Sequence, residues 1–417
     1  MKRRDFVKFL AAAGVSSPLL SPSSCLGADE KAAASERVNI GAIGVGGRGG
    51  QVFRGMLGCS NAQVVAVADC YKSRRERSAQ VCGGKAYFDF QEILADESID
   101  AVTVCTPDHW HVPIALYAAR AKKSCYVEKP LGLTLQQVLS CEKVFAENKV
   151  HFQYGTQQRS QTNCLIGCEM VRQGRIGKIK EIEVYSPNGG TGGNPTPCPI
   201  PEDLGEDGYD RWLGPAPKVP YCADRCRPNG TYWIYDQSIG YLGGWGAHPL
   251  DIMVWGSDAD LSGLVTVEGT GKIGEPLYNT VYDWDMNIML GDVKVKFVAT
   301  NRDSTKFIGE NGDWIDVYRH GLKASSPDLI ANPDLKNAIL TVSTNHAQNF
   351  VDAVRFDRTP VSCLKDAVRS DTISHLCDIA VRTQSKVVWD PKKRELVNPT
   401  PEQSAMVSRP MREPWTL

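Results

Sequence analysis

Short apolar runs separated by helical patterns dominate the first third of the chain. Between the runs, apolar residues recur every three or four positions, as they do from Val52 to Leu57, which is the period of one helix face. Runs that are apolar throughout are typical of strands buried on both faces, and strands that alternate with helices build a parallel, doubly wound sheet. The pattern therefore predicts an α/β domain with strands at 38–43, 64–68, 100–105, 124–127 and 151–155.

The pattern changes beyond the last of these strands. An alternating run at 179–185 and several strand-like runs within 265–300 predict an open, mostly antiparallel sheet. Amphipathic helices are predicted at 346–356 and 365–383. A Pro- and Gly-rich stretch at 188–230 is a long loop, and loops of that length are usually functional or disordered.

These patterns divide the chain into three parts. We expect a leader and linker over 1–35, the doubly wound domain over 36–156, and a second α/β domain over 157–417. The Pro-rich tail from Asp390 is expected to wrap the surface of the chain or of a neighbouring subunit.

The first apolar run breaks into a glycine turn that opens a helix. Gly44, Gly46 and Gly49 have the spacing G-x-G-x-x-G. In this context the first glycine allows a tight turn, the second lets the backbone approach a pyrophosphate, and the third lets helix and strand pack closely. Asp69 ends the next strand, about 20 residues later, where it can accept a hydrogen bond from a ribose hydroxyl. The stretch predicts a dinucleotide site.

The same acidic residue favours NAD over NADP, because a carboxylate at Asp69 would repel a 2′-phosphate. Arg74 and Arg75 follow closely and are within reach of such a phosphate. We interpret these two arginines as a solvated helix start.

Charge excludes some classes of partner. The formal net charge is −1 over 417 residues, so there is no polybasic footprint for nucleic acid or an anionic membrane. Beyond the N-terminal leader, no apolar run is long enough to span a bilayer. Cysteines at 222 and 226 leave one disulfide open as an alternative, and no cluster suggests a metal.

The N-terminus has the form of an export signal. Lys2-Arg3-Arg4 precedes an apolar run and then Ser-, Pro- and Ala-rich sequence. Paired arginines followed by Asp-Phe-Val-Lys are typical of a twin-arginine leader, so we expect export by the twin-arginine machinery and a periplasmic location. Cys25 is an alternative lipid acceptor, but the residues before it fit that role poorly.

Polar residues collect where the predicted parallel strands end. Ligands of such sheets bind outside the carboxyl ends of the strands, so these side chains are candidate site residues. They are His109, His111, Glu128, Lys129, Gln157 and Arg159.

Taken together, the motifs resemble the Gfo/Idh/MocA oxidoreductase family, named for glucose–fructose oxidoreductase and inositol dehydrogenase. The resemblance covers nearly all of the chain after the leader and is closest to an exported bacterial branch. It implies a Rossmann domain followed by an α/β domain whose open sheet supports the substrate site and often an oligomer, here a homodimer or homotetramer. The motifs are the glycine turn 44–49, Thr106-Pro107-Asp108-His109-Trp110-His111, Glu128-Lys129-Pro130, Gly155-Thr156-Gln157-Gln158-Arg159 and 243–251.

The resemblance also implies catalytic roles. Lys129 matches the family lysine that lies between nicotinamide and substrate, and His248 matches the catalytic histidine of the second domain. Oxidising a secondary alcohol requires a base for the hydroxyl proton, and an imidazole serves this purpose near neutral pH. Many members carry an aspartate four residues before the histidine, where this chain has Gly244. Asp251, one helical turn after His248, is the alternative partner for the imidazole.

The expected binding residues complete this picture. Those for the cofactor are Gly44, Gly46, Gly47, Arg48, Gly49, Asp69, Thr106, Pro107, His111, Glu128 and Lys129. Those for the substrate are Gln157, Arg159, Trp233, Tyr235 and His248.

Three functions remain open from the sequence. The first is an oxidoreductase that transfers hydride between a tightly bound NAD and a secondary hydroxyl of a sugar, polyol or glycoside. The second is a glycoside hydrolase or lyase that recycles NAD through a 3-keto sugar, although that branch typically lacks the lysine that Lys129 matches. The third is a sugar-binding protein without catalysis.

Overall fold

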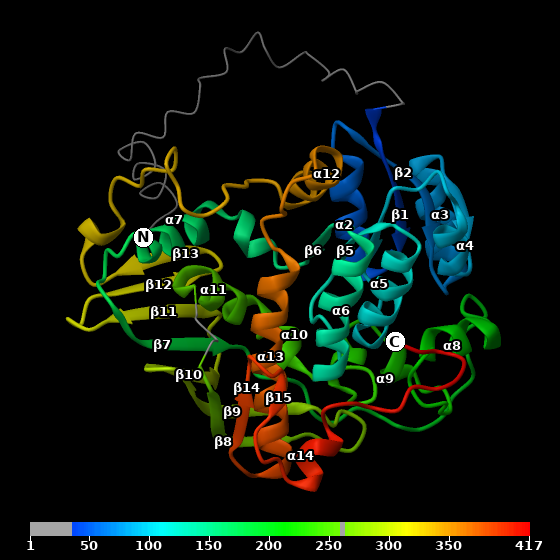
Figure 1. Cartoon of the computed structure of the whole chain (residues 1–417). Coiled ribbons are helices and arrows are strands. Elements are labelled where there is room, and N and C mark those ends of the chain that lie inside the picture. The colour runs from blue at the N-terminus through cyan, green and yellow to red at the C-terminus, as the bar shows by residue number, and fades with distance from the viewer. Residues whose placement is uncertain (1–35, 259–262) are drawn as a thin grey trace.

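The computed structural model describes residues 36–258 and 263–417, and shows two sheets flanked by helices (Figure 1). The predicted leader at 1–35, with Cys25, lies outside the described residues. Within the described ranges, every helix is too short or too polar to cross a membrane.

The first sheet is a six-stranded, fully parallel Rossmann sheet in the order β3-β2-β1-β4-β5-β6. The order reverses between β1 and β4, which is the switch point where such sheets bind ligands. This confirms the predicted doubly wound domain. Its strands are β1 Val38–Ile43, β2 Ala62–Ala68, β3 Lys85–Tyr87, β4 Ala101–Val104, β5 Ser124–Val127 and β6 Phe152–Tyr154.

Two apolar clusters cover the two faces of this sheet. One joins β1 and β2 to helix α2, and the other joins β4, β5 and β6 to α4, α5 and α6. Local sequence fixes some helix ends: Thr134 caps α6, and Asp89 with Glu92 forms a capping box at α4. The helices are α2 Gly47–Leu57, α3 Lys72–Cys82, α4 Phe90–Ala95, α5 His111–Arg120 and α6 Leu135–Asn148.

The second sheet has nine strands in the order β13-β12-β11-β7-β10-β9-β8-β14-β15. All neighbouring pairs are antiparallel except β7 and β10, which confirms the mostly antiparallel prediction. Helices α7, α11 and α13 pack against one face. Its strands are β7 Ile179–Ser186, β8 Val265–Ile273, β9 Val281–Leu290, β10 Val293–Ala299, β11 Ser304–Gly309, β12 Trp314–Tyr318, β13 Gly321–Ala324, β14 Val387–Asp390 and β15 Glu395–Leu396.

The stretch at 188–230 is ordered and partly helical. It contains α8 Gly205–Leu213 and α9 Ala223–Cys226, and it has a small apolar core of its own around Tyr209 and Trp212. Cys70 and Tyr71, which follow Asp69, pack into that core. Cys222 and Cys226 both have free thiols, so the disulfide left open by the sequence is absent here.

The C-terminal segments return to the first domain. Phe350 and Val351 of α12 (His346–Phe356) join the apolar cluster of β1 and α2. The tail lies on its own chain: Trp415 packs edge-on against Trp110, with ring centroids 4.7 Å apart. The remaining helices are the 3-10 turns η3 Asp108–Trp110, η4 Gln157–Ser160, η5 Thr231–Trp233 and η6 Pro327–Ile330, with α7 Thr162–Arg172, α10 Tyr241–Gly244, α11 Ala247–Ser257, α13 Leu364–Thr383 and α14 Pro401–Ala405.

Candidate active site

The glycine turn has the close packing that its sequence predicts. Gly44 has a φ of +76°, in the region that favours glycine. A Cβ on Gly49 would collide with the carbonyl oxygen of Gly44, so only glycine lets α2 start this close to β1. No side chain caps the start of α2 at Gly46, which leaves its first N–H groups available to an anion. The turn therefore fits the pyrophosphate of a dinucleotide.

Asp69 shapes this turn as well as facing the ribose position. Its Oδ2 accepts from the backbone N–H of Val45 at 2.9 Å, and its Oδ1 accepts from Tyr71 N–H at 2.9 Å. Burial raises the pKa of the Asp69 carboxyl, while the nearby Arg74 guanidinium lowers it.

Arg74 and Arg75 lie in the first turn of α3, where the sequence places them, and both are partly exposed. Arg74 stacks over the Tyr71 ring at 3.9 Å, and its Nη1 would lie 2.6 Å from a Cβ on Gly46. Arg75 donates to the carbonyl oxygens of Asp69 and Cys70. The loop at 188–230 packs against Cys70 and Tyr71 beside them, a contact that the sequence did not predict.

Glu128 is the centre of a buried polar network at the end of β5. Its Oε1 accepts from Arg48 Nε at 3.0 Å, Gln157 Nε2 at 2.6 Å and Tyr126 O–H at 3.3 Å. A Cβ on Gly155 would lie 2.8 Å from the Glu128 carboxyl carbon, which explains the glycine at that position. Arg48 and Gln157, predicted for cofactor and substrate respectively, thus converge on one carboxylate.

Lys129 projects from the first domain toward the second. Its Nζ donates to the carbonyl oxygen of Gly244 at 2.7 Å and lies 5.6 Å from the centre of the Tyr232 ring. Burial lowers the pKa of Lys129, opposed by the carboxylates of Glu128 and Asp108. A lysine with a lowered pKa can exchange a proton more readily near neutral pH.

His248 lies at the second position of α11, and its side chain is buried. Burial, followed by the positive charges of Lys129 and Arg319, holds the pKa of His248 well below its usual value. The positive end of α11 acts in the same direction. The imidazole is therefore neutral at pH 7 and able to accept a proton. Its Nδ1 is buried and contacts no hydrogen-bond partner within 36–258 and 263–417.

The expectation that Asp251 orients His248 does not agree with the contacts. Both oxygens of Asp251 accept from Arg159, at 2.7 Å from Nε and 2.6 Å from Nη2. Arg159 Nη1 donates to Val361 O and to Asp366. The guanidinium makes four hydrogen bonds and the residue is 1% exposed, so we revise Arg159 from substrate contact to a residue that connects η4, α11 and α13. The spacing of Asp251 from His248 could not show that Asp251 would instead pair with the buried Arg159.

His111 links two strand ends. Its Nδ1 lies 2.7 Å from Pro130 O and its Nε2 lies 2.9 Å from Thr106 O. With both ring nitrogens engaged by backbone oxygens, we interpret His111 as a residue that positions the Lys129 loop, in place of the expected direct cofactor contact. Thr106 Oγ1 is buried and has no partner in the described chain, and it precedes Pro107 at the start of η3.

A series of aromatic ring contacts leads to His248. Trp233 and Tyr241 have ring centroids 4.3 Å apart, Tyr241 and Trp245 5.3 Å, and Trp245 and His248 6.1 Å. Tyr232 continues this group at its other end, 6.2 Å from Trp233. Such a wall suits the apolar face of a sugar ring. The sequence named only Trp233 among these as a substrate residue.

Tyr235, the other aromatic predicted for the substrate, lies elsewhere. Its ring is held between Arg382 at 3.4 Å and Arg409 at 3.6 Å, so it fastens the C-terminal tail to α13. We therefore withdraw Tyr235 from the substrate residues. Cation–π packing between segments so distant in sequence leaves no local signal.

Arg319 is a site residue that sequence reasoning missed. It follows β12, its Nε donates to Asp303 at 2.8 Å, and its guanidinium lies 5.1 Å from the Trp245 ring centre. Its Nη2 is buried without a partner in the described chain. The neighbouring sequence carries no motif, so only the fold could find it.

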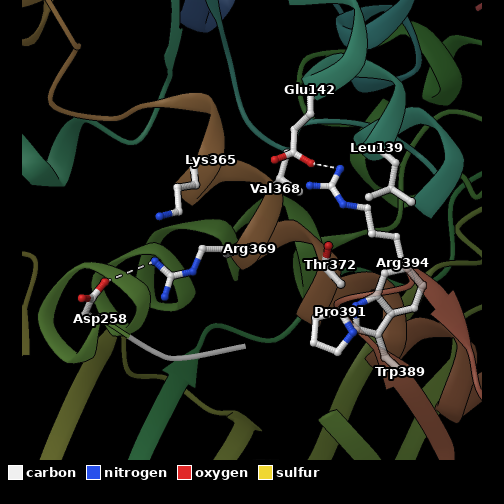
Figure 2. Close-up of a pocket in the computed structure, with 10 residues that line it drawn as sticks. All are labelled: Leu139, Glu142, Asp258, Lys365, Val368, Arg369, Thr372, Trp389, Pro391 and Arg394. Carbon is white, nitrogen blue, oxygen red and sulfur yellow. Dashed lines mark ion pairs between the residues drawn. The ribbon is translucent and has the colours of Figure 1, made fainter. Parts of the chain in front are cut away.

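A separate hollow of about 580 Å³ lies between α6, α13 and the β14–β15 turn (Figure 2). Four of its charged residues form ion pairs across it, Glu142 with Arg394 and Asp258 with Arg369. None of its lining residues belongs to the network of Lys129 and His248.

Two domains of one protein family match most of the chain. The NAD-binding Rossmann domain of the GFO_IDH_MocA oxidoreductase family matches residues 38–156, and the family's C-terminal α/β domain matches residues 189–417. The chain belongs to this oxidoreductase family. NAD is therefore the cofactor of its N-terminal domain, in agreement with the fit of the glycine turn.

Individual relatives match in part. The inositol 2-dehydrogenase of Rhizobium meliloti is 31% identical over 150 residues, which are 36% of this chain and 45% of that protein. A glycosyl hydrolase family 109 protein of Shewanella pealeana is 27% identical over 43% of this chain and 44% of its own length. The chain thus spans less than half of each of these two relatives.

A solved structure extends the likeness of fold. The WlbA dehydrogenase from Bordetella pertussis, crystallised with NADH and UDP-GlcNAcA, superposes with a TM-score of 0.63 at 14% identity. The superposition covers 84% of this chain and 98% of that one. At this identity the comparison supports the fold alone.

Proposed function

We propose that this member of the family oxidises a secondary hydroxyl of a sugar, a polyol or a glycoside, and that it keeps its NAD tightly bound. NAD, when bound, supplies the hydride acceptor. The observation that carries the proposal is the meeting of Lys129 and His248, from different domains, at the carboxyl edge of the Rossmann sheet. The lysine is held on the carbonyl oxygen of Gly244, four residues before the histidine.

The two residues have complementary roles. His248 is neutral and buried, so it is suited to accept the proton of the reacting hydroxyl. Lys129, with its lowered pKa, polarises the same oxygen and stabilises the negative charge that develops there. The wall of Trp233, Tyr241 and Trp245 orients the ring of the substrate and excludes water.

The buried network around Glu128 holds the opposite side of the site. Arg48 and Gln157 fix the carboxylate, and the second oxygen of Glu128 is buried without a partner in the described residues. That oxygen is an acceptor for the amide or ribose groups of NAD. Together with Thr106 Oγ1, it gives the cofactor side of the site two polar contacts.

A second candidate function is a glycoside hydrolase that oxidises the sugar, eliminates the aglycone and then returns the hydride. The similarity to a family 109 glycosyl hydrolase favours it. The absence of a carboxylate partner for His248 within the described residues is a further departure from a simple dehydrogenase relay. Lys129 argues for the first candidate, because the NAD-recycling hydrolase branch typically lacks the lysine that Lys129 matches.

One experiment separates the two candidates. The protein is purified without added nucleotide, denatured, and its released NAD(H) is quantified. The native protein is then offered sugars and aryl glycosides while reduced nicotinamide and free aglycone are measured in parallel. Accumulation of reduced cofactor with sugars supports the oxidoreductase. Release of aglycone with stoichiometric bound NAD and no net reduction would replace it with the hydrolase.

We also propose export by the twin-arginine route to the periplasm, supported by Arg3-Arg4 and the apolar stretch that follows. Replacing both arginines with lysine should leave the enzyme in the cytoplasm, as cell fractionation would show. Fractionation that is unchanged by the substitution would contradict this route.

We also propose that the chain forms a homodimer or a homotetramer. Strands β9 and β10 alternate between buried and exposed positions, so the second sheet presents one face outward. Light scattering after gel filtration should give a mass of two or four chains. A single-chain mass would overturn it.

A further inference from the structure

Three buried nitrogen atoms near the proposed reaction centre have no hydrogen-bond partner within 36–258 and 263–417. They are Nδ1 of His248, Nε1 of Trp245 and Nη2 of Arg319. The rings of Trp245 and His248 are 6.1 Å apart, and the Arg319 guanidinium is 5.1 Å from the Trp245 ring. Leaving such buried groups without a hydrogen-bond partner destabilises a folded protein. A cluster of them indicates a place where a ligand supplies acceptors.

Two of these nitrogens are obligatory donors. An indole and a guanidinium carry N–H groups and have no lone pair to offer. A carboxylate offers two acceptor oxygens, one for each of these N–H groups, whereas a sugar hydroxyl offers a single oxygen. Asp303 binds the same guanidinium through Nε at 2.8 Å. A carboxylate only accepts, so it matches this surface better than a hydroxyl does.

The neighbourhood carries both signs of charge. Arg319 pairs with Asp303 and Arg48 with Glu128, and the carboxylates of Glu128 and Asp108 act on the Lys129 ammonium. The ammonium of Lys129 donates to a backbone carbonyl. A Cβ on Gly244 would meet Pro130 at 4.0 Å, an ordinary contact distance, so the glycine leaves the room of a side chain beside the carbonyl that holds Lys129. A negatively charged substrate would enter next to Lys129 without meeting a side chain at residue 244.

We propose that Arg319, with the indole N–H of Trp245 beside it, binds the carboxylate of an acidic sugar, so that uronic or aldonic acids are preferred to neutral aldoses and polyols. The inference rests on the proposed function, because it places that carboxylate on the substrate whose hydroxyl His248 deprotonates. Arg319 is then a residue that determines specificity. Its ion pair with Asp303 fixes the guanidinium so that Nη2 remains for the ligand.

The test compares acids with their neutral partners. Glucuronate and glucose, galacturonate and galactose, and gluconate and glucitol are titrated calorimetrically into the protein loaded with NADH, and turnover of each is measured with NAD. The wild type should bind the acid of at least one pair about 10-fold more tightly or better. Arg319→Gln should weaken binding of the acid by about 10- to 100-fold, the range for losing a charged hydrogen bond, and leave binding of the neutral sugar nearly unchanged.

Arg302→Gln is the matched control. Arg302 pairs with Asp316 at 2.8 Å and stacks on Tyr185. The Arg302→Gln variant therefore loses an ion pair similar to that of Arg319, near the same edge of the sheet. It should behave as the wild type, and NADH fluorescence should show that all three proteins hold cofactor. Equal binding of acid and neutral sugar in every pair, binding of neither, or equal losses for both in Arg319→Gln would overturn the proposal. Selective binding of an acid without any turnover would instead retain the carboxylate subsite and reject the oxidoreductase function.

Discussion

Asp203 caps helix α3 from the loop at 188–230, with its Oδ1 2.7 Å from the backbone nitrogen of Ser73 and its Oδ2 2.6 Å from the Ser73 hydroxyl oxygen. Helix α3 has no side-chain cap of its own, because Tyr71 occupies its N-cap position. The contact holds the loop against the turn that follows Asp69, where the ribose of NAD is expected. We therefore expect the loop to help retain the adenosine end of NAD.

Asp203→Ala should release NAD faster. The change removes a helix cap worth roughly 0.5–2 kcal/mol, so the dissociation rate should rise by about 2- to 30-fold. The rate is measured by chasing bound NAD with an excess of labelled NAD. The adjacent exposed residue Glu202 provides the control variant Glu202→Ala. Identical release from both variants would show that the loop does not retain the cofactor.

Lys129→Met should abolish most hydride transfer while the protein still folds and binds NAD. Methionine fills a similar volume but cannot polarise the reacting oxygen, and the loss in kcat should be about 10²- to 10⁴-fold. Stopped-flow absorbance of reduced nicotinamide gives the rate, and thermal unfolding with and without NAD checks the fold. Normal turnover in this variant would remove Lys129 from the mechanism.

His248→Asn should remove the acid limb of the pH–rate profile. The pKa of His248 lies well below its usual value, so the wild type keeps a neutral base until the pH falls well below about 6.5. Below its pKa the imidazole is protonated and activity is lost. Asparagine does not titrate, so the residual rate should be flat over that acid range. A variant with the wild-type profile would show that another group is the base.

Asp69→Ala should weaken NAD binding by about 10-fold and reduce the preference for NAD over NADP. The carboxylate is lost as a ribose acceptor, while Arg74 remains next to the glycine turn to meet a 2′-phosphate. The double variant Asp69→Ala/Arg74→Ala should lose any gain in NADP affinity. Both affinities can be measured by fluorescence of the reduced cofactors. Unchanged affinities for both would reject Asp69 as the ribose acceptor.

His375→Leu should make the protein less sensitive to acid. Burial lowers the pKa of His375 to about 3, so between pH 6.5 and 3 the unfolded chain binds a proton that the native state does not. The free energy of unfolding therefore falls as the pH falls below 6.5. The free energy of unfolding of His375→Leu, measured with urea, should rise relative to that of the wild type by about 2 kcal/mol as the pH falls from 7 to 5. If the free energy of unfolding falls equally in both proteins as the pH is lowered, His375 is not the origin of the acid sensitivity.

The local features of the first domain could be derived from the chain alone. Apolar runs and glycine spacing identify β1, the turn at Gly44 and the acid at Asp69, because each depends on neighbours within a few residues or on one βαβ unit. Lys129 and His248 were likewise identified from motifs that extend over only a few residues.

Pairings across the chain were decided by the tertiary structure. Asp251 is one turn from His248 in sequence, yet it binds Arg159, because a buried guanidinium requires a carboxylate more strongly than a neutral imidazole does. Tyr235 and Arg319 were misjudged or missed for the same reason. Their partners, Arg409 and Trp245, lie more than 70 residues away, where no periodicity or motif connects them. The sequence determined the elements of the first domain and the motifs that contain Lys129 and His248. The packing of distant segments determined which buried polar groups are left without a partner in the described residues.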